Sequence, residues 1–319
     1  MIFFEDLLQE ANNDLVQQAI KEGDKALGYN CYNIPEALLN LPGCFSSRLR
    51  APNTTSSEMA NYYMTELQIK VVDRLADIGI DTSEAAMKAA IEDHNKISAV
   101  ITEIGDLRKL PNPPITGYEF HVIQLVSEVC PHRLILPYLE ETLEELKSRK
   151  PEKEFPFRAR IVLAGAEIDD PKFTQLIESC GAMVVADRYC FGSIPSREQI
   201  VIKDGETAFE AICRHYIETN PCPRYMDGCK IDQRHELLEN LVRDYSADGI
   251  IIENMKFCEF WGYEKVLSNY ILGTEKGIPT CTIEKEYSLG SVGQLRTRFQ
   301  AFVEGLEIKD IKDNGKVGA

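Results

Sequence analysis

The sequence predicts an α/β protein whose C-terminal half is a parallel sheet covered by helices and whose N-terminal half is rich in helices. From residue 157 on, continuous apolar runs alternate with amphipathic stretches, which is typical of parallel strands buried on both faces. Before that point, turn-forming residues are dense at first, and apolar residues then recur at helical spacing. The later pattern is that of Rossmann-like and flavodoxin-like domains, in which ligands bind beyond the carboxyl ends of the strands.

Three parts follow one another along the chain, residues 1–65, 66–156 and 157–319. The first part holds an amphipathic opening and then so many turn formers that only short strands or helices fit between them. The second part predicts helices over 66–106, about 118–126 and 140–150, and ends in a linker at 151–156. The third part predicts strands at 159–165, 182–187, 249–253 and 278–283, and helices at 171–179, 207–219, 233–245, 263–272 and 293–306.

Composition and charge exclude several classes of function. With 319 residues, of which 44% are hydrophobic and 27% charged, the chain is normal for a globular protein of about two domains. Its formal net charge of -16 argues against binding to nucleic acid or to an anionic membrane, because both are polyanions. No apolar run approaches the ~20 residues of a transmembrane helix, and acidic residues near the start are unlike a secretory signal, so we expect a cytoplasmic protein. Neither GxGxxG nor a P-loop is present to bind a nicotinamide or ATP.

Ten cysteines need an explanation in a reducing compartment, where disulfides are rarely stable. No two of them have CxxC spacing, so the sequence supports neither a zinc ribbon nor a ferredoxin-like run. A free cysteine is also a good small core residue, so context has to separate packing from metal ligation. Packing is expected within helices and strands, where Cys180, Cys213 and Cys281 fall. Both roles stay open for Cys31, Cys44, Cys130 and Cys229.

Cys190 and Cys258 have the context of metal ligands. Each follows a predicted strand and precedes a helix, so both thiols are expected at the edge of the sheet where ligands bind. Backbone N–H groups and helix N-termini favour a thiolate there, and Gly192 and Gly262 would let the backbone approach a bulky group. Cys222 lies between two prolines, in a loop with no reason to bury a hydrophobe. The alternative for Cys190 and Cys258 is plain packing against the sheet edge.

Four other residues are candidates for roles near such a site. Glu36 follows a proline and Glu119 follows a Gly-Tyr pair, and either could act as a general acid or base, although solvated glutamates are far commoner. His121 is expected to be a hydrogen-bonded structural histidine rather than a ligand. Trp261, the only tryptophan, follows the Cys258 loop and is expected to shield the site from water.

Five segments carry recognisable motifs: DRYCFGS at 187–193, KFCEFWGYE at 256–264, SVGQLRTRFQAF at 291–302, TGYE at 116–119 and GYNCYNIPE at 28–36. They resemble the 2-hydroxyacyl-CoA dehydratase family, which includes benzoyl-CoA reductase subunits and double-cubane cluster proteins. The resemblance covers most of the chain and is strong from about residue 115 to the end. Family members continue after the equivalent of residues 61–65 with a substantial α/β stretch that contains further cysteines. This chain lacks that stretch, so its N-terminal α/β domain is expected to be incomplete.

The resemblance implies an iron–sulfur subunit from anaerobic metabolism. Family members hold a 4Fe–4S or double-cubane cluster with cysteines from two α/β domains, and they act as homo- or heterodimers of homologous subunits. An ATP-dependent iron–sulfur activator protein supplies single electrons at very low potential, which serve radical dehydration or reduction of an acyl-CoA or other small substrate. By motif match Cys190 and Cys258 correspond to cluster ligands, with Cys222 as a further candidate. Cys31, a partner subunit or a non-cysteine ligand would complete the set.

Two other interpretations of the sequence remain open. The chain could be a non-catalytic or degenerate structural subunit that pairs with a complete homologue. It could also be a metal-free α/β binding domain in which the cysteines serve packing alone. Iron bound after anaerobic purification separates the cluster-binding interpretation from both of these.

Overall fold

The computed structural model describes most of the chain. The described residues are 14–29, 44–48, 64–65, 67–77, 79–129, 132–149, 157–190, 192–193, 198–219, 222–224, 228–286, 290 and 292–315. Cys31, Glu36 and Cys130 lie outside them. The chain forms two compact units, unit 1 with residues 1–92 and 200–219, and unit 2 with residues 93–199 and 220–319. The division of the sequence into three consecutive parts stays a prediction.

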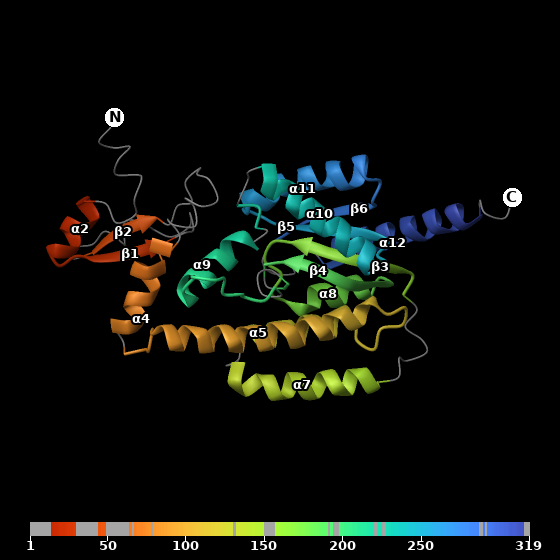
Figure 1. The fold of residues 1–319 in the computed structure, drawn as a ribbon. Helices are drawn as coiled ribbons and strands as arrows, with labels where there is room; N and C mark the ends of the chain where they lie inside the picture. Colours follow the sequence, from red (N-terminus) through yellow and green to blue (C-terminus); the bar gives the residue numbers. More distant parts are fainter. Residues whose placement is uncertain are drawn as a thin grey trace. The chain divides into compact units, whose positions relative to one another are not determined.

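Unit 2 contains the predicted parallel sheet (Figure 1). Its four strands are β3 (Ala159–Gly165), β4 (Ala182–Tyr189), β5 (Gly249–Met255) and β6 (Thr280–Lys285). All pairs are parallel, and the order across the sheet is β4-β3-β5-β6. The strands fall where the apolar runs predicted them, and the fold class is confirmed. Strands β4 and β5 each run two residues beyond their predicted ends, which brings the following loops closer to the sheet.

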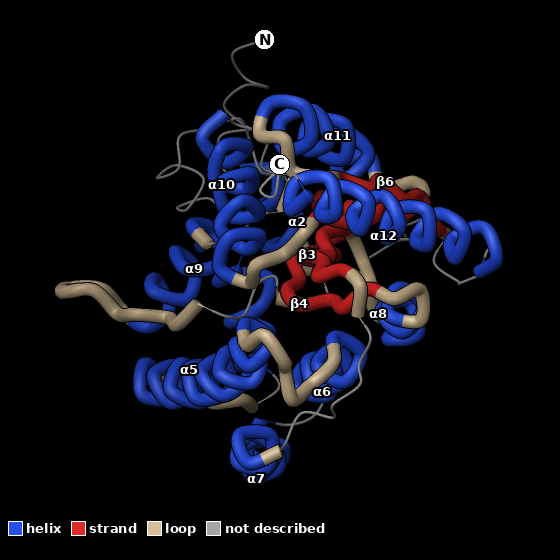
Figure 2. The backbone as a smooth tube through the Cα atoms, turned by 90° about the vertical axis from the view of Figure 1, so that its right-hand side faces the viewer, coloured by secondary structure: helices blue, strands red, loops and turns tan. Residues whose placement is uncertain are grey.

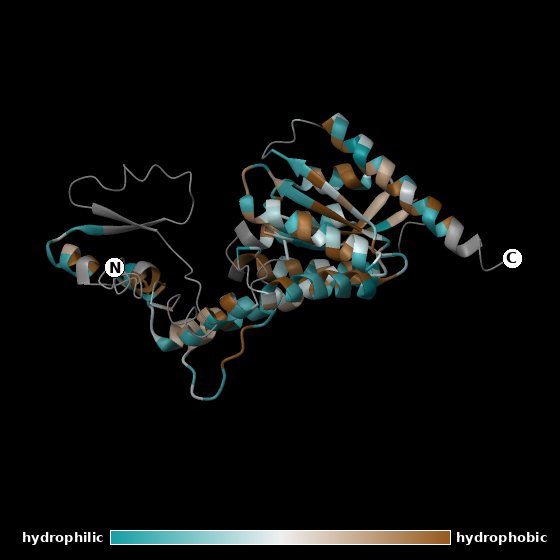
Figure 3. Ribbon diagram, turned by 90° about the horizontal axis from the view of Figure 1, so that it is seen from above, coloured by the Kyte–Doolittle hydropathy of each residue, from teal (hydrophilic) through white to brown (hydrophobic). Residues whose placement is uncertain are grey.

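Helices cover both faces of this sheet (Figure 2). Because successive side chains of a strand point to opposite faces, Ile161 and Leu163 of β3 pack on one side and Val162 and Ala164 on the other. The first side is covered by α8 (Pro171–Glu178) and α12 (Val292–Gly315), and the second by α10 (Gly228–Asp244) and α11 (Glu259–Ser268). Burial on both faces explains why the strands are continuous apolar runs rather than alternating ones. Hydrophobic and hydrophilic residues alternate along the covering helices (Figure 3).

A layer of three helices forms a further core within unit 2. It consists of α5 (Glu84–Asp106) from residue 93 on, α6 (Gly117–Val129) and α7 (His132–Ser148). Ile104, Phe120 and Leu146, one from each helix, are almost fully buried against one another. Helix α7 begins eight residues before the predicted start at 140, because the helix continues through Pro137 where a proline usually signals a break.

The described part of unit 1 consists mostly of short elements. Strands β1 (Lys25–Tyr29) and β2 (Cys44–Arg48) pair in parallel beside α2 (Asp14–Lys21). A π-helical turn at Gln68–Val72 leads into α4 (Asp73–Asp77), and the first part of α5 packs against α9 (Ala208–Glu218). The Glu84 carboxylate at the start of α5 accepts a hydrogen bond from the Ala208 N–H at the start of α9, at 3.0 Å.

No helix among the described residues combines the length and the apolar character that crossing a bilayer requires.

Candidate metal centre

The loops with the candidate ligands lie at the carboxyl edge of the sheet in unit 2. Cys190 directly follows β4, and Cys258 is the third residue after the end of β5. Strand β3 lies between β4 and β5. The chain therefore continues from β3 to its neighbour on one side, β4, and later forms its neighbour on the other side, β5. Such a reversal is the topological switch point of an open parallel sheet, where diverging loops leave a crevice for a ligand. The fold therefore places both cysteines where it offers a binding site.

Three of the predicted ligands are neighbours at this edge. Burial raises the pKa of the Cys190 thiol to about 12, and the nearby Cys222 and Cys258 raise it further because neighbouring thiolates repel. Burial also raises the pKa of Cys258, with a further contribution from Cys222. All three side chains are partly exposed. Cys190, Cys222 and Cys258 thus lie near enough for their charges to interact. Their role as metal ligands stays a prediction, as does that of Cys31 outside the described residues.

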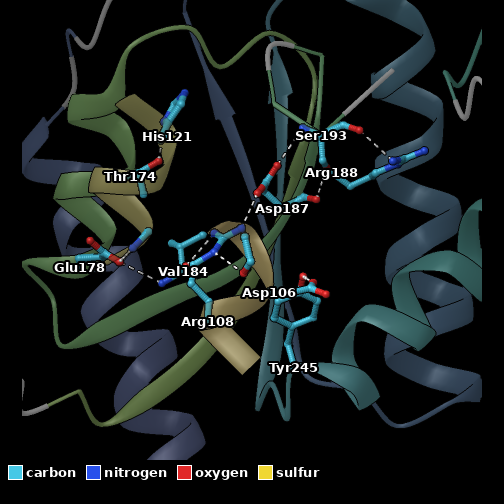
Figure 4. Close-up of polar contacts among 12 residues, drawn as sticks. Asp106, Arg108, His121, Thr174, Glu178, Val184, Asp187, Arg188, Ser193 and Tyr245 are labelled. Carbon is cyan, nitrogen blue, oxygen red and sulfur yellow. Dashed lines mark hydrogen bonds and ion pairs between the residues drawn. The ribbon is translucent and has the colours of Figure 1, made fainter. Parts of the chain in front are cut away.

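The loop that carries Cys190 is held by backbone and side-chain hydrogen bonds. The Cys190 N–H donates to the Ala166 carbonyl at 2.8 Å, which ties the end of β4 to the end of β3. The Asp187 carboxylate accepts from the Ser193 N–H at 2.9 Å, and the Ser193 hydroxyl donates to the Asp187 carbonyl (Figure 4). A side chain at Gly192 would collide with the Tyr189 ring, so this glycine is needed for the tight turn itself. Of the two glycines expected to leave room for a bulky group, only Gly262 has open space beside it.

Arg108 holds this loop through a buried ion pair, and the sequence analysis did not identify it. Its side chain is 1% exposed and forms a buried ion pair with Asp187 at 3.1 Å (Figure 4). The guanidinium also donates to the Val184 carbonyl of β4 at 3.2 Å and lies 3.8 Å from the centre of the Phe120 ring. An isolated arginine in a turn-rich segment carries no sequence signal of this kind. Its partner Asp187 does carry a sequence signal, because a buried aspartate at a strand end needs a cation.

A second buried charge pair lies at the same edge. Glu253 of β5 is fully buried, and its carboxylate accepts from the Ala166 N–H at 2.9 Å. Burial raises the pKa of Glu253 to about 7, against the lowering effect of Lys285, whose Nζ is 3.9 Å away. The Lys285 ammonium donates to the Glu167 carbonyl at 3.3 Å. Gly165 leaves the room that the Glu253 side chain needs, because a Cβ there would lie 2.7 Å from it.

Cys258 is the N-cap of α11, and its side chain forms no capping hydrogen bond. The backbone N–H of Trp261 favours the Cys258 thiolate, and the indole N–H of Trp261 favours the Cys190 thiolate. Trp261 is 5% exposed, so the prediction that it shields the site from water agrees with its burial. The residue before the cap, Phe257, has a positive φ of 71° and a side chain that is 94% exposed.

A buried polar network fixes α11 to α10. Arg234 of α10 pairs with Glu264 of α11 at 2.7 Å, and both side chains are at most 4% exposed. His235 adds a contact to Glu264 at 3.2 Å and to the Ser268 hydroxyl at 3.0 Å. Since α11 begins at the Cys258 cap, this network sets where the Cys258 thiol lies relative to the sheet.

Glu119 makes structural contacts in unit 2. Thr116 and Glu119 form a capping box at the start of α6, in which the Glu119 carboxylate accepts from the Thr116 N–H at 2.8 Å. The same carboxylate pairs with Arg149 at 3.2 Å. Its acid–base role stays a prediction, and Glu36 lies outside the described residues. His121 is buried between the Thr174 hydroxyl and the Ile168 carbonyl, and burial lowers its pKa, as expected of a structural histidine.

The cysteines expected in the core are in the core. Cys180 is 3% exposed and Cys213 is fully buried, while Cys281 packs against the same cluster as Cys180. Cys229 is exposed on α10, with its sulfur 3.6 Å from the Gln233 amide. Packing thus accounts for Cys180, Cys213 and Cys281 without any ligand.

The candidate ligands at the sheet edge are all thiols. Within the described residues, no three His, Cys, Asp or Glu side chains come together as one ion requires. Thiolates are the ligands that iron–sulfur clusters use. The Trp261 indole N–H, buried without a full hydrogen bond to any described residue, is a donor of the kind that cluster sulfurs accept.

Comparison with known proteins gives a family match over most of the chain. The family model described as 2-hydroxyglutaryl-CoA dehydratase, D-component, matches residues 27–306. The matched region includes Cys190, Cys222 and Cys258.

Three similar proteins have names that describe dehydratase subunits. The Escherichia coli (strain K12) protein YjiM is 26% identical over 251 residues, which are 76% of this chain and 62% of that protein. Lactoyl-CoA dehydratase subunit beta of Anaerotignum propionicum is 22% identical over 80% of this chain and 67% of its own length. The (R)-phenyllactyl-CoA dehydratase beta subunit of Clostridium sporogenes is 25% identical over 76% of this chain and 62% of its own length. The chain spans about two thirds of the length of these relatives.

Proposed function

Because the chain belongs to the 2-hydroxyglutaryl-CoA dehydratase D-component family, we propose that it is the iron–sulfur subunit of a 2-hydroxyacyl-CoA dehydratase-like or benzoyl-CoA reductase-like system. The observation that carries this proposal is the gathering of Cys190, Cys222 and Cys258 at the switch point of the sheet. Packing accounts for the cysteines inside helices and strands, but it gives no reason for three partly exposed thiols to meet in loops.

In this proposal Cys190, Cys258 and Cys222 hold a 4Fe–4S or double-cubane cluster. A bound cluster supplies one-electron chemistry at low potential, for radical dehydration or reduction of an acyl-CoA thioester or another small substrate. The chain's own residues position the ligands: Asp187 and Arg108 fix the Cys190 loop, and the pair of Arg234 with Glu264 fixes the helix that Cys258 caps. Trp261 excludes water from the thiols.

The proposed partners follow from the family. An ATP-dependent iron–sulfur activator would supply the electrons, and a homologous subunit would form a homo- or heterodimer. Two of the relatives are named beta subunits, which supports a multi-subunit assembly. Three thiols leave one position of a cubane without a cysteine ligand. Cys31, the partner subunit or a non-cysteine group would occupy that position.

A second candidate function is a structural subunit that pairs with a complete homologue and binds no cluster. The observation in its favour is that the chain matches only 62% of the length of two of the relatives. Under this alternative Cys190 and Cys258 stay protonated, which their raised pKa values permit at neutral pH.

The two functions differ in iron content. We expect protein purified without oxygen to contain about four irons per chain for one cubane, or about eight for a double cubane, with matching acid-labile sulfide. Replacing Cys190 or Cys258 by Ser removes a sulfur ligand and should lower the iron content sharply, and Cys222→Ser should lower it as well. Measurement of iron and sulfide per folded chain checks this.

Two control variants separate ligation from general damage. Cys180→Ser alters a buried core thiol and should cost stability but no iron, and Cys229→Ser alters an exposed thiol and should change neither. Equal iron in all five variants and the unmodified chain would contradict the ligand assignment. A folded protein without iron would favour the structural subunit.

A further inference from the structure

Helix α11 exposes an apolar stripe, which consists of Phe260, Tyr263, Val266 and Tyr270. These residues recur at steps of three or four, so they share one side of α11 and of the π-helical turn that continues it. They are 37%, 66%, 64% and 56% exposed, in the order of the chain. The helix lies at the outside of unit 2 in two perpendicular views (Figure 1 and Figure 2).

The opposite side of α11 is already packed within the chain. Trp261, Glu264, Ser268 and Leu272 are at most 5% exposed, and they contact the sheet and α10. A helix that covers a core on one side normally carries charged and polar side chains on the other. The outer side of α11 carries the apolar stripe instead, and a contiguous exposed apolar surface marks a site of interaction with another molecule.

The lysines beside the stripe have their charges balanced within the chain. Each forms an ion pair with a glutamate: Lys256 with Glu286 at 2.8 Å, Lys265 with Glu284 at 3.5 Å and Lys276 with Glu239 at 3.1 Å. The net charge of the whole chain is -16, so two copies repel each other over most of their surface. Local balance weakens this repulsion beside the stripe, which makes it a surface that a second copy can approach.

Both ends of the stripe carry charges that a second copy would complement. Arg224 lies at the first end, with its guanidinium carbon 5.5 Å from the centre of the Phe260 ring. Glu275 follows the last residue of the stripe by five positions. Neither forms an ion pair with another residue in the part of the chain that the structure describes. A two-fold axis that sets two stripes antiparallel brings Arg224 of each copy to the Glu275 end of the other.

We propose that a second copy of this chain docks on the apolar stripe, with the two α11 helices antiparallel across a two-fold axis. In such a contact the same patch meets itself, so it has to be self-complementary. Phenylalanine and tyrosine rings meet this condition because they pack favourably against one another, and antiparallel helix dipoles attract. The inference rests on the proposed function only for the homologous partner subunit, which it makes an identical chain. Phe260 follows Cys258 by two residues, so the contact borders the candidate metal centre.

The first test compares Tyr263→Glu with Tyr138→Glu. Tyr138 is 67% exposed on α7 of the same unit, so this control places the same charge at an equally exposed tyrosine. Sedimentation equilibrium of each full-length chain gives the dissociation constant of the dimer. We expect Tyr263→Glu to raise this constant at least ~30-fold, as loss of a central interface aromatic does, and Tyr138→Glu to leave it unchanged. A dimer that Tyr263→Glu does not weaken would overturn the inference, as would an unmodified chain that is monomeric at about 100 μM.

Charge reversal tests the antiparallel arrangement without altering the stripe. Arg224→Glu and Glu275→Arg should each weaken the dimer several-fold, and the double variant should restore it, because each reversed charge then meets its opposite again. Glu304→Arg is the control for net charge, since it lies on α12, which covers the other face of the sheet. A double variant that dimerises no more tightly than the single variants would overturn the proposed arrangement.

Iron measured in the same samples keeps this inference apart from the proposed cluster. Monomers that contain iron would overturn the inference and leave the proposed cluster intact. Dimers that contain no iron after anaerobic purification, and that Tyr263→Glu separates, would support the inference and contradict the cluster.

Discussion

Among the described residues of the candidate metal centre, Phe257 has the least favourable backbone. Its φ of 71° lies in the left-handed region, which bulky side chains avoid, and such a conformation costs about 1–3 kcal/mol. The side chain is 94% exposed, so packing does not offset this cost. The strain is stored in the turn that joins β5 to Cys258, where the Cys258 N–H donates to the Met255 carbonyl at 3.1 Å.

Relief of this strain should stabilise the turn. We expect Phe257→Gly to raise the free energy of unfolding by up to about 1 kcal/mol, because glycine adopts positive φ without strain but loses more chain entropy on folding. Phe257→Ala, the matched control, loses the ring but keeps the strain and should leave stability nearly unchanged. Urea unfolding curves of the two variants provide the comparison. A glycine variant less stable than the alanine variant would mean that this φ carries no strain.

Single residues of the site differ in how well the sequence reveals them. Cys190 and Cys258 were placed correctly, because a strand end is set by a local apolar pattern and fixes the edge of the sheet at which the next loop lies. For Glu119 the sequence analysis considered only an acid–base role or a solvated side chain, although TGYE at 116–119 has the spacing of a capping box. Arg108 was not readable, because its partner lies 79 positions later in the chain and pairs with it only after β4 has folded.

At the scale of elements, the sequence predicted the strands closely but not their order. Buried parallel strands have a strong local signature, and β3 spans the residues that the apolar run predicted. The choice of neighbours depends on how the connecting helices pack, so the order β4-β3-β5-β6 came only from the structure. The start of α7 was missed for a different reason. Pro137 lies inside that helix, where surrounding contacts outweigh the local preference of proline.

The pair of Arg108 and Asp187 joins two elements, the turn after α5 and the end of β4. Both side chains are 1% exposed, so removal of either partner leaves the other charge buried without its counter-ion. We expect Arg108→Met and Asp187→Asn each to destabilise unit 2 by about 3 kcal/mol, and the double variant to cost clearly less than the sum. Chemical unfolding of the three variants measures the coupling between the residues.

An exposed pair is the control for this prediction. Arg74 and Asp77 lie 3.2 Å apart with side chains 54% and 63% exposed, and such pairs contribute about 0–1 kcal/mol. Arg74→Met should therefore change stability little. Additive effects of the Arg108 and Asp187 replacements would show that the two residues act independently. Because Asp187 also holds the Cys190 turn, its replacement should speed alkylation of Cys190, whereas Arg74→Met should not.

At the scale of the whole molecule, two buried carboxyl groups make the stability of unit 2 depend on pH. Burial raises the pKa of Glu178 to about 7, against three backbone N–H donors that favour its carboxylate. Burial likewise raises the pKa of Glu253 to about 7. Between pH 4.5 and 7 the folded state binds more protons at these groups than the unfolded state, so stability falls as pH rises through this window. His121 acts in the opposite direction below pH 6.5, because burial lowers its pKa.

The contribution of the two carboxyl groups can be isolated with neutral variants. Each group contributes a slope of up to about 1.4 kcal/mol per pH unit, so Glu178→Gln with Glu253→Gln should make the stability of unit 2 fall less steeply from pH 5 to pH 7. Urea unfolding followed by the fluorescence of Trp261, the single tryptophan, reports on this unit. The control is Glu145→Gln. The Arg149 hydrogen bond lowers the pKa of this exposed carboxyl. The contribution of Glu145 to stability therefore changes with pH only below about 4.5. The same slope in the unmodified chain, the control and the double variant would show that Glu178 and Glu253 do not titrate in this window, and that other groups compensate for their burial.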